Sequence, residues 1–374
     1  MPKEPWGVLQ GVRPTKLARN LIKKGVDPVF VSEALQNDYE VSKQKADIVA
    51  RVLKHQTCII RNESLVNLYI NIPICPSRCS YCTFISAEYK AVESLIQDYV
   101  DALITEIRAV KKIIANKPYV VRSIYVGGGT PTVLNEEQLD QILQELSYPV
   151  TEFTVECGRP DTITESKLQV LKRNGVTRIC INPQTFSQRT LRKIGRSNST
   201  KDVINAYMLA LKYDFKVNMD LIAGFEGETL RIFKNNIKTL LELSPNNVTI
   251  HTLAVKKNSE IMGQDIQNPE VESMVDYAYN TLSDEGYKPY YLYRQKHQLG
   301  GLENIGYCKK GDQCMYNIDS IEETCSIIAC GANAMSKRVY FLDEKIERVK
   351  NYKFIHDYIN NIDEEIKKKL LMFK

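Results

Sequence analysis

Three closely spaced cysteines are the residues of this sequence best suited to chemistry. Cys75, Cys79 and Cys82 follow the spacing C-x3-C-x2-C and come directly after the apolar run 68–72. The prolines of the intervening segment PICP oppose a helix, so we expect the thiols on a loop at the C-terminal end of a strand. Soft thiolate ligands select zinc, cuprous copper or iron–sulfur clusters.

Three thiolates can hold a [4Fe–4S] cluster and leave one iron without a protein ligand. A small chelating molecule can bind and react at that iron. The alternatives are a zinc loop and three unrelated thiols. A zinc site would need a fourth ligand, usually Cys or His, and the nearest histidines are His55 and His251. The pattern therefore favours a cluster bound by Cys75, Cys79 and Cys82.

Strand-like and helix-like segments alternate six times from Asn67 onward. We expect strands at 67–72, 122–126, 152–157, 177–182, 216–222 and 247–252. We expect helices at 91–116, 136–146, 164–174, 200–213, 228–243 and 270–285. The alternation predicts a parallel sheet with right-handed crossovers. Six such units fit a partial (β/α)6 TIM-like barrel, and a doubly wound open sheet is the alternative.

The C-terminal ends of these strands carry polar or glycine-rich segments. A glycine-rich segment, 127–132, follows the second strand, and the later strand ends supply Glu156, Gln184, Asp220 and His251, with Arg196 beyond the fourth strand. Each of these residues could instead have a purely structural role, as a paired strand-end carboxylate, a turn residue or a core histidine. Because active sites of α/β barrels form at this end of the strands, the set together predicts a site beside the cysteines.

The sequences before and after this region lack the alternation of strands and helices, so we expect the chain to have three parts. Residues 1–62 are expected to form a helical module, with helices at 14–24, just after Pro28 and from Ser42. The barrel is expected over 63–295. Residues 296–374 are expected to form an α+β extension that ends in a charged helical tail after Asp343.

Composition narrows the class of protein. The 374 residues carry a net charge of +5, which does not call for nucleic acid. No apolar run approaches the roughly 18 residues of a membrane span, and the first residues lack the apolar core of a signal peptide. Ten cysteines without an export signal predict a reducing, cytoplasmic location. A second metal site from Cys308, Cys314, Cys325 and Cys330 is an alternative, although their spacing is irregular.

Several motifs together resemble the oxygen-independent coproporphyrinogen III oxidase family of radical S-adenosylmethionine (SAM) enzymes, and most closely its coproporphyrinogen dehydrogenase HemZ branch. The segments that carry the resemblance run from about Trp6 to Lys350. They are WGVLQGVRPTKL, LYINIPICPSRCSYCTF, YVGGGTPT, FTVECGRPDTIT, RICINPQTF, NMDLIAGF, VTIHTLAVK and ENIGYCKKGDQCMYNI.

The resemblance implies a radical SAM partial barrel with two cofactors. Cys75, Cys79 and Cys82 would bind a [4Fe–4S] cluster whose fourth iron takes the amino and carboxylate groups of SAM. The residues that match the family's SAM-binding positions are Tyr69, Gly128, Gly129, Thr130, Glu156, Gln184, Arg196 and Asp220. Reductive cleavage of SAM would give a 5′-deoxyadenosyl radical. That radical would drive oxidative decarboxylation of coproporphyrinogen III propionates to the vinyl groups of protoporphyrinogen IX.

The resemblance also implies partners and leaves an alternative function open. A low-potential donor such as flavodoxin or ferredoxin would supply electrons, and cations such as Arg13, Arg294 and Arg338 would bind the substrate carboxylates. Phe84 stands where oxidases of this family often carry a further cysteine. A heme-binding or heme-trafficking relative, the heme chaperone HemW, also has an aromatic residue there. HemW has a His-Asn pair where this chain has Tyr316-Asn317, and this difference weakens a simple assignment as a heme chaperone. A HemW-like function on the same scaffold is therefore the alternative.

Overall fold

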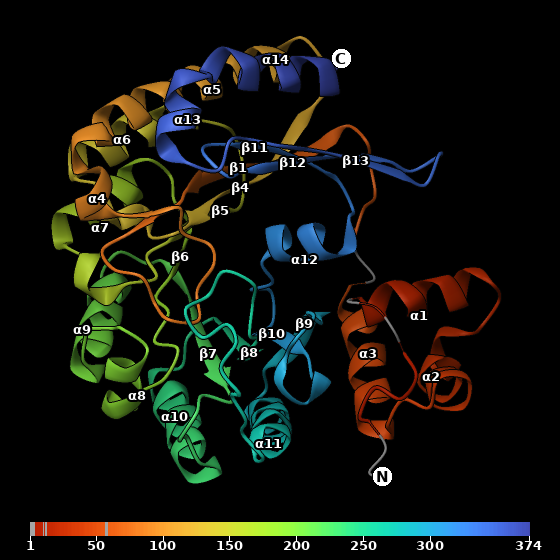
Figure 1. The fold of residues 1–374 in the computed structure, drawn as a ribbon. Helices are drawn as coiled ribbons and strands as arrows, with labels where there is room; N and C mark the ends of the chain where they lie inside the picture. The colour runs from red at the N-terminus through yellow and green to blue at the C-terminus, as the bar shows by residue number, and fades with distance from the viewer. Residues whose placement is uncertain (1–3, 10, 12, 57–58) are drawn as a thin grey trace. The chain divides into compact units, whose positions relative to one another are not determined.

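The structure is a computed structural model that describes residues 4–9, 11, 13–56 and 59–374. Cys58 lies outside these residues. The chain divides into two compact units, which are described separately (Figure 1). Unit 1 comprises Met1–Ile59, Gln184–Ile194 and Asn218–Gln313, and unit 2 comprises Ile60–Pro183, Gly195–Val217 and Cys314–Lys374.

Unit 2 is built on a mixed sheet whose centre is parallel. Its strand order is β13-β12-β11-β1-β4-β5-β6, and β11, β1, β4, β5 and β6 run parallel to their neighbours. The parallel strands are β1 (Leu65–Ile72), β4 (Val120–Gly128), β5 (Phe153–Glu156), β6 (Arg178–Cys180) and β11 (Ser326–Cys330). Side chains of β1 and β4 are almost entirely buried, as expected for strands covered on both faces.

Helices connect these strands and cover the sheet of unit 2. They are α4 (Tyr89–Val92), α5 (Ile96–Ala115), α6 (Glu136–Gln144), α7 (Glu165–Arg173), α9 (Thr200–Leu211) and α12 (Met315–Glu322). The longest, α5, buries the stripe Tyr99, Leu103, Ile107 and Val110 at helical spacing. Asn135 and Gln138 form the reciprocal capping box that begins α6. The expected strand and helix segments of this region are confirmed.

The C-terminal segment differs from the helical tail predicted after Asp343. Residues there first form β13 (Lys345–Lys350), which pairs antiparallel with β12 (Met335–Tyr340). Only then do α13 (Ile355–Asn360) and α14 (Ile362–Met372) follow. The tail prediction was wrong because β13 is an edge strand, and edge strands carry the charged residues that otherwise suggest an exposed helix.

A buried polar network joins the C-terminal helix to α5 within unit 2. Glu106 on α5 accepts hydrogen bonds from the backbone N–H of Gly331 at 2.7 Å, from the hydroxyl of Tyr358 at 2.7 Å and from the amide of Asn351 at 2.9 Å. Lys369 on α14 forms an ion pair with the same carboxylate, and both side chains are almost fully buried. This cluster, the Glu106 network, therefore ties α5, α14 and the β11–β12 turn together.

Unit 1 contains strands of mixed direction and the N-terminal helices. β7 (Lys216–Ala223) pairs parallel with β8 (Asn247–Thr252), which pairs antiparallel with β10 (Asn304–Cys308), and β9 (Lys288–Tyr293) forms the edge. The helices are α1 (Pro14–Lys23), α2 (Val31–Tyr39), α3 (Lys43–His55), α8 (Gln188–Lys193), α10 (Leu230–Leu243) and α11 (Val271–Asp284). No described helix is long and apolar enough to cross a membrane.

The three predicted N-terminal helices are present and pack within unit 1. Lys45 of α3 is buried and forms ion pairs with Glu303 at 2.8 Å and Asp276 at 2.9 Å. Gln56 donates its amide to the carbonyl of Tyr290 on β9 at 2.8 Å. The N-terminal helices thus share a core with the later segments of unit 1. The three-part division at residues 62 and 295 stays a prediction.

Candidate functional site

The cysteine loop is closed at its base by a short pair of strands. β1 ends before Pro73, and β2 (Ile74–Cys75) pairs in parallel with β3 (Ala87–Glu88). The N–H of Ser86 donates to the carbonyl of Pro73 at 2.7 Å. The pairing of β2 with β3 therefore brings the two ends of the loop together. Cys75 ends β2, and Cys79 and Cys82 lie in the loop, so all three candidate ligands follow the C-terminal end of β1, as predicted.

Close backbone packing explains the glycines after β4. The N–H groups of Gly129 and Thr130 donate to the carbonyls of Ile72 and Ile74 at 2.9 and 2.8 Å. A Cβ on Gly129 would lie 2.4 Å from the carbonyl oxygen of Ile74, and one on Gly128 would lie 1.9 Å from Oδ1 of Asn71. Gly128 also has φ +103°, which strongly favours glycine. The glycines are thus required for the 127–130 segment to lie against the strand that leads into the cysteines.

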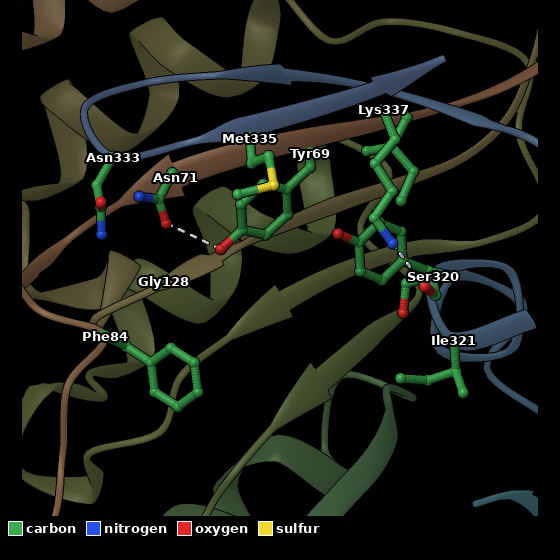
Figure 2. A pocket seen from close by; sticks show the side chains of 11 residues that line it. Tyr69, Asn71, Phe84, Gly128, Ser320, Ile321, Asn333, Met335 and Lys337 are labelled. Atoms are coloured by element: carbon green, nitrogen blue, oxygen red, sulfur yellow. Dashed lines mark hydrogen bonds between the residues drawn. The ribbon is translucent and has the colours of Figure 1, made fainter. Parts of the chain in front are cut away.

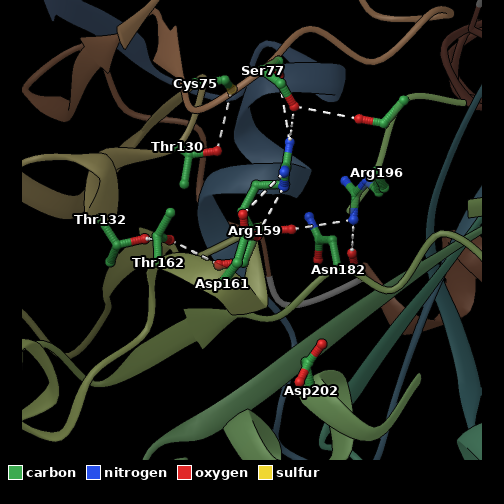
Figure 3. A network of polar contacts seen from close by, with 12 residues as sticks. Cys75, Ser77, Thr130, Thr132, Arg159, Asp161, Thr162, Asn182, Arg196 and Asp202 are labelled. Carbon is green, nitrogen blue, oxygen red and sulfur yellow. Dashed lines mark hydrogen bonds and ion pairs between the residues drawn. The ribbon is translucent and has the colours of Figure 1, made fainter. Parts of the chain in front are cut away.

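The three thiols share one environment. Sγ of Cys75 lies 3.2 Å from Oγ1 of Thr130 (Figure 3). The pKa of the Cys75 thiol is raised to about 12, mainly by burial and also by the neighbouring thiols of Cys82 and Cys79, while Thr130 and Arg159 oppose the shift. Because its charge interacts with both other cysteines, Cys75 is their neighbour in space. A bound cation or cluster is the kind of group that would keep so buried a thiol deprotonated.

Two buried arginines flank the cysteine loop (Figure 3). Arg159 donates to Oγ of Ser77 at 3.0 Å and is held by a bidentate pair with Asp161. Arg196 donates to the carbonyl of Asn182 at 2.6 Å. Burial alone would lower the pKa of Arg196, but the Tyr81 hydroxyl and the cysteine thiols outweigh it and hold that pKa above its usual value. The two guanidinium groups favour a net negative charge at the loop.

These residues fit a cluster better than a single metal ion. Among the described residues, no three His, Cys, Asp or Glu side chains converge as ligands of one ion. In an iron–sulfur cube each thiolate binds a different iron, so its thiolates lie farther apart than the ligands of one ion. Three neighbouring thiols, with a hydroxyl and two guanidinium groups beside them, are the kind of donor set that such a cluster takes. Cys75, Cys79 and Cys82 would hold the cluster.

A group of tyrosines surrounds Glu156 beside this loop. The hydroxyl of Tyr125 donates to Oε1 of Glu156 at 2.7 Å, and that of Tyr69 donates to Oδ1 of Asn71 at 2.8 Å. Tyr316 stacks on Tyr125 and on Tyr69, with ring centroids 4.4 and 5.9 Å apart. Burial raises the pKa of Tyr69, and the charge of Glu156 adds to this effect. The predicted residues Tyr69 and Glu156 therefore lie in one aromatic cluster.

A pocket of about 370 Å³ opens at this tyrosine cluster (Figure 2). Two of its lining residues, Tyr69 and Gly128, are among the predicted SAM-binding residues. The other walls come from α12, from β11 and from the first residues of β12. Unit 2 therefore brings together the cysteine loop, Tyr69, the glycine segment, Glu156 and Arg196, and it adds a cavity beside them.

The remaining predicted residues lie together in unit 1. Gln184 has φ +64°, and its N–H donates to the carbonyl of Asp220 at 2.8 Å. Oδ2 of Asp220 lies 3.7 Å from Nε2 of His251. Burial opposes ionisation of Asp220, but the hydrogen bond and charge of His251 outweigh it and lower the pKa of Asp220. The side-chain oxygen of Gln184 is buried without a hydrogen-bond partner among the described residues, as expected of a group that awaits a ligand.

A buried carboxyl beside Gln184 gives a pH prediction. Burial raises the pKa of Glu228, and the hydroxyl of Thr185, which donates at 2.5 Å, opposes the shift. A carboxyl with a raised folded-state pKa makes the protein less stable as pH rises from the unfolded-state pKa through the folded-state one. Glu228→Gln should therefore raise the free energy of unfolding at pH 7 by roughly 1 kcal/mol, the scale of one buried polar contact, and the gain should vanish near pH 4.

Urea unfolding at several pH values measures this effect. Glu226→Gln is the matched control, because Glu226 is half exposed and pairs with Lys193 on the surface. An equal gain in both variants, or a gain for Glu228→Gln that persists unchanged at acid pH, would contradict the assignment.

Sequence reasoning missed several residues of this arrangement. Arg159 and Ser77 beside the cysteines were not singled out, nor were Tyr125 and Asn71. A buried arginine in a strand-end segment, GRPDTIT, was the available signal for Arg159. Among the expected substrate cations, Arg294 donates to the carbonyls of Leu9 and Gly301, and Arg338 donates to that of Met372. These contacts favour structural roles for both.

The cysteines proposed as a second metal site have different surroundings. Cys308 ends β10 in unit 1, whereas the other three belong to unit 2. Cys314 contacts the carboxylate of Glu152, and Cys325 lies beside Asp319. Burial raises the pKa of both thiols. Such environments suit buried, protonated thiols in the core.

Comparison with known proteins places the fold and these motifs in a family. A model described as the radical SAM superfamily matches residues 69–240. The coproporphyrinogen III oxidase HemN from Escherichia coli, a radical SAM enzyme, has a similar structure, with a TM-score of 0.64 at 20% identity over 84% of this chain and 72% of that chain. The predicted class, a radical SAM partial-barrel α/β fold, is thereby confirmed.

Two curated relatives narrow the family. The oxygen-independent coproporphyrinogen-III oxidase-like protein HemZ of Bacillus subtilis is 35% identical over 365 residues, 93% of this chain and 72% of HemZ. The heme chaperone HemW of the same organism is 34% identical over 195 residues, half of each chain. The chain belongs to the oxygen-independent coproporphyrinogen-III oxidase-like family of radical SAM proteins.

Proposed function

We propose that this chain is a radical SAM oxidoreductase that converts propionate side chains of coproporphyrinogen III to vinyl groups. The observation that carries the proposal is the cysteine loop: three neighbouring thiols, the Thr130 hydroxyl and two buried guanidinium groups on one rim. Similarity to HemZ over 93% of the chain supports the choice of substrate.

The residues of the site have separate roles in this proposal. Cys75, Cys79 and Cys82 hold a [4Fe–4S] cluster, which together with SAM supplies a carbon radical able to abstract hydrogen. Arg196 and Arg159 offset the negative charge of the thiolates. Gly128, Gly129 and Thr130 hold the strand end against the cysteine loop. Tyr69 lines the pocket beside it, and Glu156, Gln184 and Asp220 are the further residues proposed to contact SAM.

Partners and location follow the same proposal. A low-potential donor such as flavodoxin or ferredoxin would reduce the cluster, and the substrate is a porphyrinogen. Work in a reducing cytoplasm suits nine described cysteines, none of them in a disulfide.

The direct test is product analysis. Under strict anaerobiosis with SAM, reductant and coproporphyrinogen III, the protein should form protoporphyrinogen IX and 5′-deoxyadenosine together. Heat-treated protein is the control. SAM cleavage without any tetrapyrrole product would contradict the proposed substrate while leaving the radical SAM class intact.

A heme-trafficking function is the second candidate. The observation that favours it is the similarity of half the chain to the heme chaperone HemW, together with Phe84 after the third cysteine. Titration with heme distinguishes the two. Stoichiometric binding with a Soret shift, and transfer to a heme-free acceptor, would support this candidate, whereas an unchanged Soret band would remove it.

A further inference from the structure

The pocket described above has one face built by alternate residues of a single hairpin. Asn333, Met335 and Lys337 all line it. Met335 and Lys337 lie two apart on β12 and so project to the same side of the strand, and Asn333 lies in the turn that precedes it. Figure 2 shows Met335 beside the ring of Tyr69, Lys337 on the side of Ser320, and Asn333 on the side of Asn71. The pocket thus combines an aromatic and thioether wall with an amide at one end and an ammonium at the other.

Two cations, Lys337 and Arg348, lie at the ammonium end. Nζ of Lys337 donates to the carbonyl of Ser320 at 2.9 Å and lies 3.9 Å from Oε1 of Glu323. The same carboxylate oxygen is closer, at 3.0 Å, to Arg348. Two cations therefore share one carboxylate. The Lys337 side chain is about one-fifth exposed, so an anion that enters the pocket can reach it.

The amide end carries an unsatisfied acceptor. Oδ1 of Asn333 is buried and has no hydrogen-bond partner among the described residues. Its backbone is fixed, because its N–H donates to the carbonyl of Tyr352 at 2.7 Å and its φ is +63°. A buried acceptor without a partner points to a donor supplied by a ligand.

The size of the pocket limits what it can hold. Its volume of about 370 Å³ is near the lower end for small-molecule sites. It admits one five-membered aromatic ring with its side chains but not a complete tetrapyrrole. Tyr69 and Gly128 line the pocket and are themselves predicted to contact SAM, so a ring bound there would lie beside the expected SAM site.

We propose that this pocket is the subsite that binds one propionate-bearing pyrrole ring of the substrate. Lys337 pairs with the propionate carboxylate, Asn333 accepts the pyrrole N–H, and Met335 and Tyr316 pack against the ring. The inference rests on the proposed function and deepens it, because it names the residues that select a ring with both a donor and an acidic arm.

Anaerobic equilibrium dialysis tests it without turnover. Wild-type protein lacking SAM is dialysed against coproporphyrinogen III or its tetramethyl ester, and the bound ligand is oxidised afterwards and read by porphyrin fluorescence. Lys337→Met should weaken binding of the acid by at least about tenfold, the scale of one charge-assisted contact, and leave binding of the ester unchanged. Asn333→Gly, which suits the positive φ, should weaken binding of both ligands.

Two control variants lie on the same hairpin. Lys345→Met removes an exposed lysine that pairs with Glu347, and Glu344→Gly changes another residue with positive φ. Both should bind like wild type. If the wild type binds the acid and Lys337→Met binds it equally well, the subsite is overturned while the proposed function stands. If the wild type binds neither ligand, the proposed function fails and this inference with it.

Discussion

Cys79→Ala should lose the cluster and with it all SAM cleavage. Removing one of three thiolates leaves a second iron without a protein ligand, on a loop where burial already opposes a charged Cys75. Loss of a hydrogen bond that only supports a metal ligand lowers metal affinity roughly 10–100-fold. Because Cys79 is itself a proposed ligand, we expect the iron content of the variant to fall by more than this. Iron and sulfide analysis after anaerobic reconstitution measures this, together with 5′-deoxyadenosine formation.

Cys308→Ala is the control for this prediction. Cys308 is equally buried but lies at the end of β10 in unit 1. It should retain the iron content and SAM cleavage of the wild type. Full iron content in Cys79→Ala, or an equal loss of iron in Cys308→Ala, would show that the cluster is bound elsewhere in the chain.

Lys369→Met should be the most destabilising single change outside the site. It leaves the Glu106 carboxylate fully buried with only neutral donors around it. Breaking one side of a buried ion pair typically costs about 3–5 kcal/mol. Urea unfolding should show that loss, and hydrogen exchange should become faster in α14 and in the β11–β12 turn, where Gly331 donates to Glu106.

The neighbouring Lys368→Met provides the comparison. Lys368 is more than one-third exposed and pairs with Glu365 at 3.1 Å. An exposed pair of this kind contributes about 0–1 kcal/mol. If both variants lose the same small amount of stability, the Glu106 network does not hold the C-terminal helix in the way described.

The sequence predicted the parallel part of the fold well because its signals are local. Apolar runs such as 67–72 and 247–252, and the helical stripe of α5, reflect burial that repeats with a fixed period. The capping box at Asn135 marked the start of α6 in the same way. These features do not depend on distant parts of the chain.

Long-range pairing escaped prediction. The parallel pairing of β11 with β1 joins residues about 260 positions apart, such as Tyr69 and Ala329, and no local pattern encodes it. The place of Tyr316 against Tyr69 and Tyr125 depends on the same pairing. The charged strand β13 resembled an exposed helix because both present polar residues to solvent.

Only some residues of the candidate site could be predicted, because only some of them are marked by their place in the sequence. Residues at strand ends could be found from the order of elements, so the cysteines, Glu156 and Asp220 were named from position. Arg159 contacts Ser77 in the cysteine loop, and Asn71 contacts Tyr69 and the carbonyl of Ala332. These contacts do not follow from the order of the elements along the chain. The SAM-binding roles of Tyr69, Gly128, Gly129, Thr130, Glu156, Gln184, Arg196 and Asp220 stay predictions.

The central claim is that Cys75, Cys79 and Cys82 hold a [4Fe–4S] cluster with one open iron. Electron paramagnetic resonance of the reduced, anaerobically reconstituted protein tests it most directly, with and without SAM. We predict about four irons and four sulfides per chain and a cluster signal that changes when SAM is added. Stoichiometric zinc in place of iron, or a cluster signal that SAM leaves unchanged, would contradict the account.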